Sequence, residues 1–252
     1  MKVSEVYEYI DSFAPFSEQA DWDNSGVLMG TPEKETAKAL VCLDLTEAAA
    51  AYAVSQGCGL IVSHHPVIFR GVKQIAYPSV FTELIRGDVS VISAHTNLDI
   101  APGGVNDTLC ETLGMDYEKA GPSIGGGFLN FGFLPQCRNA RGLARYLHDT
   151  LHAPVRYVDA LNEIGKIAVC AGSGGEFYRE ARSAGCTALI TGDADHHDFL
   201  EAAAIGVSLF AAGHYETEAP IVPKLAEMLS ARFPQTEFVV FPGKNPLLTL
   251  AD

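Results

Sequence analysis

The segment Lys38-Ala-Leu-Val-Cys42 recurs 128 residues later as Lys166-Ile-Ala-Val-Cys170. A second segment, Ser55-Gln-Gly-Cys58, recurs at the same offset as Ser183-Ala-Gly-Cys186. In both halves these two segments are followed by another short apolar run. Later matches keep the same order at a slightly smaller offset. Several matches in one order are typical of an internal duplication, so we expect two structurally similar halves.

Short apolar runs alternate with helical patterns along nearly the whole chain. Continuous apolar strands that alternate with helices of about ten residues are typical of βαβ units, in which a parallel sheet is buried on both faces. The sequence therefore predicts the α/β fold class. The expected strands are 39–43, 60–63, 89–93, 166–170, 188–191, 207–211 and 237–241, and the expected helices are 47–56, 80–86, 141–151, 176–184 and 221–232.

The two halves are expected to meet near the glycine-rich stretch Gly121–Gly127. Such a stretch favours a linker or a turn. We therefore predict one α/β half over residues 1–126 and a second over 127–252, with a site in the cleft between them.

Composition excludes several classes of protein. Lys and Arg number 17 against 31 Asp and Glu, so the formal charge is −14, which argues against nucleic acids and anionic membranes as partners. Hydrophobic residues make up 48% of the chain, yet no apolar run is long enough to cross a membrane, and the N-terminus lacks the pattern of a signal peptide. The six widely spaced cysteines are expected to be buried free thiols, so we expect a cytoplasmic protein.

Six of the eight histidines lie at or just beyond the ends of expected strands. Ligands of open α/β sheets bind at the carboxyl ends of the strands, so this placement is informative. Each group combines imidazole with a nearby hydroxyl or carboxylate. The groups are Ser63-His64-His65-Pro66, His95-Thr-Asn-Leu-Asp99, Asp193-Ala-Asp195-His196-His197 and His214-Tyr-Glu-Thr-Glu218.

The repeat relates these groups to one another. His95 and Asp99 correspond to His214 and Glu218, so each half presents a histidine followed four residues later by an acid. Neutral imidazole and carboxylate together suit Zn, Mn, Fe or Ni, and a carboxylate can bridge two ions about 3.5–4 Å apart. The pattern predicts a metal site built from both halves.

Other motifs favour structural roles. Gly172–Gly175 resembles a phosphate-binding turn but lacks the full dinucleotide pattern, so a tight turn from strand to helix is favoured over an anion site. Asp23–Gly26 is interpreted as a β-turn. His148 and His152 have no acid at a meaningful spacing and are expected to lie on the surface.

These motifs, together with Trp22-Asp-Asn-Ser-Gly26 and Gly103-Gly104-Val-Asn-Asp107, resemble those of one family in their order. It is the GTP cyclohydrolase 1 type 2 homolog family, also called the NGG-interacting-factor-three-like proteins. The resemblance spans about residues 22–220, and this chain resembles the short form that lacks an inserted domain. It implies two intertwined α/β halves and a toroidal homohexamer.

The resemblance also implies roles for individual residues. Two divalent ions per chain would be held by five ligands, with Asp99 or Glu218 as the bridge, and His95 would line the site. His196 would join the residues of the second shell or of proton transfer. The implied metal ligands are His64, His65, Asp99, His214 and Glu218, and the candidate catalytic residues are His95, Asp193 and His197.

Two functions remain open at this point. The first is a dinuclear metal hydrolase, in which metal-bound hydroxide opens the imidazole ring of GTP or attacks another nucleotide or phosphoester. The substrate would then be a small molecule, and a histidine such as His95 or His197 would move the proton. The second is a non-enzymatic metal-binding or interaction protein that uses the same ligands without a proton shuttle.

Overall fold

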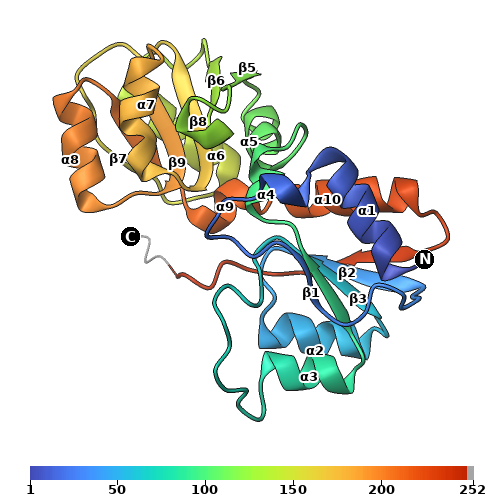
Figure 1. Cartoon of the computed structure of the whole chain (residues 1–252). Coiled ribbons are helices and arrows are strands. Elements are labelled where there is room, and N and C mark those ends of the chain that lie inside the picture. Colours follow the sequence, from blue (N-terminus) through green and yellow to red (C-terminus); the bar gives the residue numbers. More distant parts are fainter. Residues whose placement is uncertain (249–252) are drawn as a thin grey trace. The chain divides into compact units, whose positions relative to one another are not determined.

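Strands alternate with helices along the chain, as Figure 1 shows for the computed structural model, which describes residues 1–248. The chain divides into two compact units, each with its own sheet. Unit 1 comprises Met1–Pro102 and Ile221–Lys244, and unit 2 comprises Gly103–Pro220 together with the segment that starts at Asn245. The main segment of unit 2, Gly103–Pro220, therefore lies between the two segments of unit 1 in the sequence.

Unit 1 contains a sheet in the order β1-β4-β3-β2-β11. β2, β3, β4 and β11 are parallel, and the edge strand β1 is antiparallel to β4. The strands are β1 (Gly26–Met29), β2 (Lys38–Cys42), β3 (Leu60–Ser63), β4 (Ser90–Ser93) and β11 (Glu237–Val240), and the helices are α1 (Val3–Phe13), the 3₁₀ helix η1 (Phe16–Glu18), α2 (Glu47–Ser55), α3 (Val80–Arg86), α4 (Thr96–Ile100) and α10 (Ile221–Arg232).

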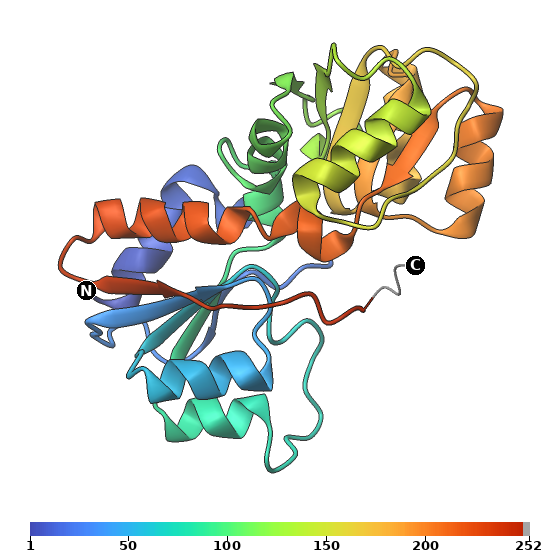
Figure 2. The same cartoon turned by 180° about the vertical axis from the view of Figure 1, so that it is seen from behind.

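Helices cover both faces of this sheet, with α2 and α3 on one face and α1 and α10 on the other (Figures 1 and 2). Leu40 and Ile61 pack against Ala50 of α2 and Leu84 of α3. The neighbouring residues along the same strands point to the opposite face, where side chains such as Val41 are also buried. Burial on both faces explains why these strands read as continuous apolar runs.

Unit 2 contains a sheet in the order β5-β6-β8-β9-β10-β7. β8, β9 and β10 are parallel, whereas β5, β6 and β7 pair antiparallel. The strands are β5 (Asp116–Lys119), β6 (Asn130–Phe133), β7 (Arg156–Tyr157), β8 (Ile167–Ser173), β9 (Ala188–Asp193) and β10 (Ser208–Ala211), and the helices are α5 (Val105–Thr112), η2 (Gly125–Gly127), α6 (Ala140–Leu151), η3 (Gly175–Phe177), α7 (Tyr178–Ser183), α8 (His196–Ala204) and α9 (His214–Glu218).

Two apolar clusters sandwich the sheet of unit 2. Ile167 and Val169 of β8 belong to the cluster with α5 and α6, whereas Ala168 and Cys170 of the same strand belong to the cluster with α7 and α8. Figure 2 shows α6 on the near face of this sheet, and Figure 1 shows α7 and α8 on the opposite face. The α/β fold class predicted from the sequence is confirmed.

The two units share an order of elements. In unit 1 the order is β2-α2-β3-α3-β4-α4, and in unit 2 it is β8-α7-β9-α8-β10-α9, with the parallel strands adjacent in both cases. Each unit also has an antiparallel strand beside the third of these strands, namely β1 beside β4 and β7 beside β10. The sequence repeat coincides with this shared order, while its origin by duplication stays a prediction.

The units divide at residues other than the boundary predicted between 126 and 127. That boundary falls inside unit 2, because β5 and β6 on either side of it pair in one antiparallel hairpin. The expected strand 237–241 lies in the predicted second half, and the corresponding β11 pairs with β2 of unit 1. Residues 249–252 of that predicted half lie outside the described residues.

All six cysteines are buried free thiols, as predicted. Burial raises the pKa of the Cys186 thiol to about 11 and that of Cys110 to about 12. Among the described residues, no helix combines the length and the apolar character needed to cross a membrane.

These thiols are expected to be inert in the native protein. A raised pKa leaves little of the nucleophilic thiolate at mildly alkaline pH, and burial blocks access to the sulfur. With Ellman's reagent we expect negligible reaction of the native chain and release of six equivalents per chain in guanidinium chloride. Rapid labelling before unfolding would contradict this packing.

Candidate metal centre

Three histidine rings of unit 1 come together beyond the ends of two neighbouring strands. His64 and His65 directly follow β3, and His95 follows β4 by one residue. Because β3 and β4 are adjacent and parallel, their carboxyl ends lie at the same edge of the sheet. The ring centroids of His64 and His65 are 4.9 Å apart, and that of His95 lies 5.2 Å from His64 and 5.5 Å from His65.

Each of these rings directs its Nδ1 toward a hydrogen-bond acceptor. Nδ1 of His64 lies 2.9 Å from the carbonyl oxygen of Ala94, and Nδ1 of His65 lies 2.7 Å from Oδ1 of Asp44. Since a carbonyl or carboxylate oxygen only accepts, Nδ1 carries the proton and Nε2 carries a lone pair. Acceptors of this kind fix the tautomer and orientation of metal-binding histidines.

His95 has the same arrangement, with Nδ1 donating to Oδ1 of Asp23 at 2.8 Å. Asp23 also accepts hydrogen bonds from Thr96 and Ser25. Burial raises the pKa of the Asp23 carboxyl, but the hydrogen bonds from His95, Thr96 and Ser25 outweigh burial and hold the pKa well below its usual range. Asp23 is therefore a carboxylate that positions His95, whereas the sequence had suggested only a β-turn.

Asp99 adds a carboxylate to this group. It lies one turn into α4 from His95, and its Oδ1 is 3.5 Å from Nε2 of His64. Residues four apart on a helix share a face, which explains the spacing of His95 and Asp99. Unit 1 thus presents three imidazoles and one carboxylate, and ligand atoms of the three imidazoles lie within 4.8 Å of one another.

Unit 2 presents a related pair. His214 begins α9 after β10, and Nε2 of His214 lies 3.2 Å from Oε2 of the buried Glu218, four residues later. Nδ1 of His214 donates to Oδ2 of Asp193 at 2.9 Å, at the end of the neighbouring strand β9. Asp193 orients His214 as Asp23 orients His95.

Two glycines allow α9 to approach the sheet this closely. A Cβ at Gly172 would lie 2.1 Å from Oε1 of Glu218, and a Cβ at Gly192 would lie 2.7 Å from the backbone oxygen of Gly172 and from Cα of His214. The amide of Gly172 donates to the hydroxyl of Thr217 at 3.1 Å, which ties β8 to α9. The turn at Gly172–Gly175 thus places Glu218, a role that the sequence did not reveal.

His197 joins a different group of side chains. It lies in the first turn of α8 with 67% of its side chain exposed, and its Nε2 is 3.4 Å from Oδ1 of Asp198. Asp195 and Asp198 form the capping box of this helix, which accounts for the two acids. The neighbouring His196 is exposed in the same turn. The catalytic role predicted for His197 stays a prediction.

The donor atoms fit a divalent transition metal. Imidazole Nε2 and carboxylate oxygen are ligands that Zn, Mn, Fe and Ni accept, and each group holds its imidazoles in the tautomer that a metal requires. The histidines His64, His65, His95 and His214 share this property.

The two α/β units have the same order of elements, and both carry histidines and carboxylates at strand ends. The chain is therefore a protein with clusters of candidate metal ligands. A family model described as Duf34/NIF3 (NGG1p interacting factor 3) matches residues 1–246, and the chain belongs to this family. The resemblance drawn from the motifs is confirmed.

Relatives and solved structures agree over nearly the full length. Proteins named GTP cyclohydrolase 1 type 2 homolog from Clostridium perfringens and Campylobacter jejuni are each 32% identical, the first over 95% of this chain and 96% of the relative, the second over 98% of both. A Staphylococcus aureus hypothetical protein superposes with a TM-score of 0.89 at 26% identity, over 99% of both chains. Reduced HcgD from Methanocaldococcus jannaschii superposes with a TM-score of 0.80 at 25% identity, over 96% of this chain and 98% of that chain.

The close approach at Gly192 leads to a stability test. Gly192→Ala places a Cβ against backbone atoms that cannot turn aside, so we expect the free energy of unfolding to fall by about 1–3 kcal/mol. Gly165→Ala is the matched control in the same unit, because its Cβ would meet Thr187 Oγ1 at an ordinary 3.6 Å. Equal urea unfolding curves for the two variants would contradict the close packing of α9 against Gly192.

Proposed function

We propose that the chain binds a pair of divalent metal ions and is a metal-dependent hydrolase. As the family resemblance implies, the ligands would be His64, His65, Asp99, His214 and Glu218, with Asp99 or Glu218 shared by the two ions. The observation that carries the proposal is the common orientation of the histidines, each with Nδ1–H donated to a fixed acceptor and Nε2 presented as a ligand.

A bound pair of divalent ions supplies Lewis acidity and lowers the pKa of water. The residues of the chain supply the rest. Nε2 of His95 is the atom that would move a proton, because Asp23 accepts the hydrogen bond from Nδ1 and holds the ring in place. Asp44 and Asp193 keep His65 and His214 in place through their Nδ1 atoms.

The names of the relatives favour a substrate class. Curated relatives carry the name GTP cyclohydrolase 1 type 2 homolog. For this chain we propose the opening of the guanine imidazole ring of GTP, or the hydrolysis of another nucleotide or phosphoester. We also propose the homohexamer that the family resemblance implies.

A non-enzymatic metal-binding or interaction protein is the second candidate, and one observation favours it. Histidines and acids in excess of the metal ligands would serve proton transfer in an enzyme. His197 is one of these, but it is solvent-exposed and lies against Asp198 of a helix cap, so it does not support catalysis. This leaves His95 as the better supported proton carrier. A protein that stores or delivers metal would need the five ligands but no proton carrier.

Metal binding is expected to depend on the ligands and on their acceptors. Asp44→Asn should lower the affinity for Zn²⁺ or Mn²⁺ about 10- to 100-fold, because the amide no longer favours the required tautomer of His65. His65→Ala should lower it further. Isothermal titration calorimetry with elemental analysis measures both affinity and stoichiometry. His148→Ala, an exposed imidazole on α6, is the control, and a similar loss there would contradict the site.

Turnover separates the two candidate functions. With Mn²⁺, Zn²⁺ or Fe²⁺ added, we expect hydrolysis of GTP or of a generic phosphodiester, abolished by His65→Ala. His95→Gln should retain the metal but lower kcat about 10²–10⁴-fold, as loss of a general acid–base does. Turnover that survives His65→Ala would overturn the dinuclear mechanism. Stoichiometric metal without turnover of a broad substrate panel would favour the second candidate.

A further inference from the structure

Two aromatic rings of unit 1 are exposed beside His95. Trp22, the single tryptophan of the chain, is 61% exposed, and Phe69 is 44% exposed. Their ring centroids are 5.9 Å apart with an interplanar angle of 51°, and they lie 6.0 and 6.1 Å from the ring of His95. We call Trp22, Phe69 and His95 the aromatic corner.

The aromatic corner is held in place by the segment that carries Phe69. Residues 66–79 make up most of the connection between β3 and α3. The side-chain amide of Asn24 donates to the carbonyl oxygen of Ile68 at 2.5 Å, which fixes this segment to the turn that follows Trp22. Val67 packs against the apolar cluster beneath α2 and α3. Exposed rings that are fixed in this way lose little conformational entropy when a ligand stacks on them.

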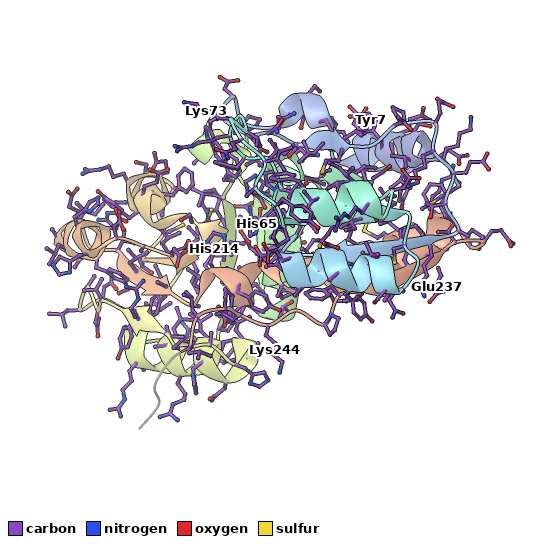
Figure 3. All side chains as sticks on the ribbon, turned by 90° about the horizontal axis from the view of Figure 1, so that it is seen from below. Tyr7, His65, Lys73, His214, Glu237 and Lys244 are labelled. Carbon is purple, nitrogen blue, oxygen red and sulfur yellow. The ribbon has the colours of Figure 1, made fainter. Side chains whose placement is uncertain are left out.

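The same segment is positively charged in an acidic protein. Residues 66–79 include Arg70 and Lys73 and contain no Asp or Glu, although the whole chain has a formal charge of −14. Both side chains are exposed, and Figure 3 labels Lys73. Arg70 directly follows Phe69 in the sequence, and both residues are exposed.

We infer that the aromatic corner and the basic segment 66–79 bind a nucleoside phosphate, with the flat base stacked on Trp22 and Phe69 and the phosphate directed to Arg70 and Lys73. Aromatic side chains stack on any base, and a positive segment attracts phosphate. His95 belongs both to the aromatic corner and to the candidate metal centre. The inference therefore deepens the proposed function by placing the base of the substrate beside the proton carrier.

Trp22 makes the inference directly measurable, because all tryptophan fluorescence comes from this one residue. The full chain is titrated with GMP in the presence of a chelator, so that the result does not depend on bound metal. We expect saturable quenching by GMP and none by ribose 5-phosphate, which lacks a base. Absence of quenching by GMP at millimolar concentration would overturn the inference.

Variants separate the two parts of the ligand. Phe69→Ala should weaken GMP binding about tenfold, within the range for loss of one stacked ring, while Phe133→Ala, an exposed phenylalanine of unit 2, should leave it unchanged. Arg70→Gln with Lys73→Gln should weaken binding of GMP but not of guanosine, and Arg145→Gln is the control for charge. Equal effects on GMP and guanosine would contradict the assignment of the phosphate.

Two further outcomes are decisive. A second copy of the chain is the alternative occupant of the aromatic corner. If Trp22→Ala changes the mass of the assembly measured by light scattering, and the chain binds no GMP, the inference is overturned in favour of the second copy. Quenching by GMP in a chain that binds no metal would refute the proposed function while leaving this inference intact. Metal-dependent turnover without quenching would do the reverse.

Discussion

In both units the parallel strands are covered by helices on each face, and this restricts where polar chemistry can occur. A polar side chain in the middle of β3 or β9 would be buried among apolar neighbours and would cost free energy unless it were hydrogen-bonded. At the carboxyl end of a strand the chain leaves the layer, and polar groups there can reach one another. His64, His95 and His214 occupy such ends, so the covering of the sheets determines the location of the candidate metal ligands.

The same restriction explains why carboxylates accompany the histidines. A buried carboxylate such as Glu218 is costly unless a cation or a hydrogen-bond donor stabilises its charge. Asp23 shows how the fold supplies donors, since three side chains from different positions converge on it. The acids near the site thus have two roles: some are candidate ligands, and others, such as Asp193, hold imidazoles in one tautomer.

Sequence reasoning predicted the elements that have a local pattern and missed the roles that depend on contacts between residues far apart in the sequence. Strands such as β3 were predicted with their bounds because burial on both faces leaves an unbroken apolar run. The edge strand β5 was missed because its residues are polar and largely exposed, and the five-residue helix α9 is too short to show a period. Candidate ligands were visible as motifs, whereas Asp44 and Asp23 gained a role only through contacts with residues 21 and 72 positions away.

The return of the chain to unit 1 after unit 2 has a consequence for biosynthesis. The strand β11 and the helix α10, which complete the first sheet and cover one face of it, are made after the whole segment Gly103–Pro220. During translation the main segment of unit 2, with all six strands of its sheet, is therefore complete while the first sheet still lacks an edge strand and a covering helix. Domains generally fold as units when their sequence is available, so the order of synthesis favours maturation of the inner unit before the outer one.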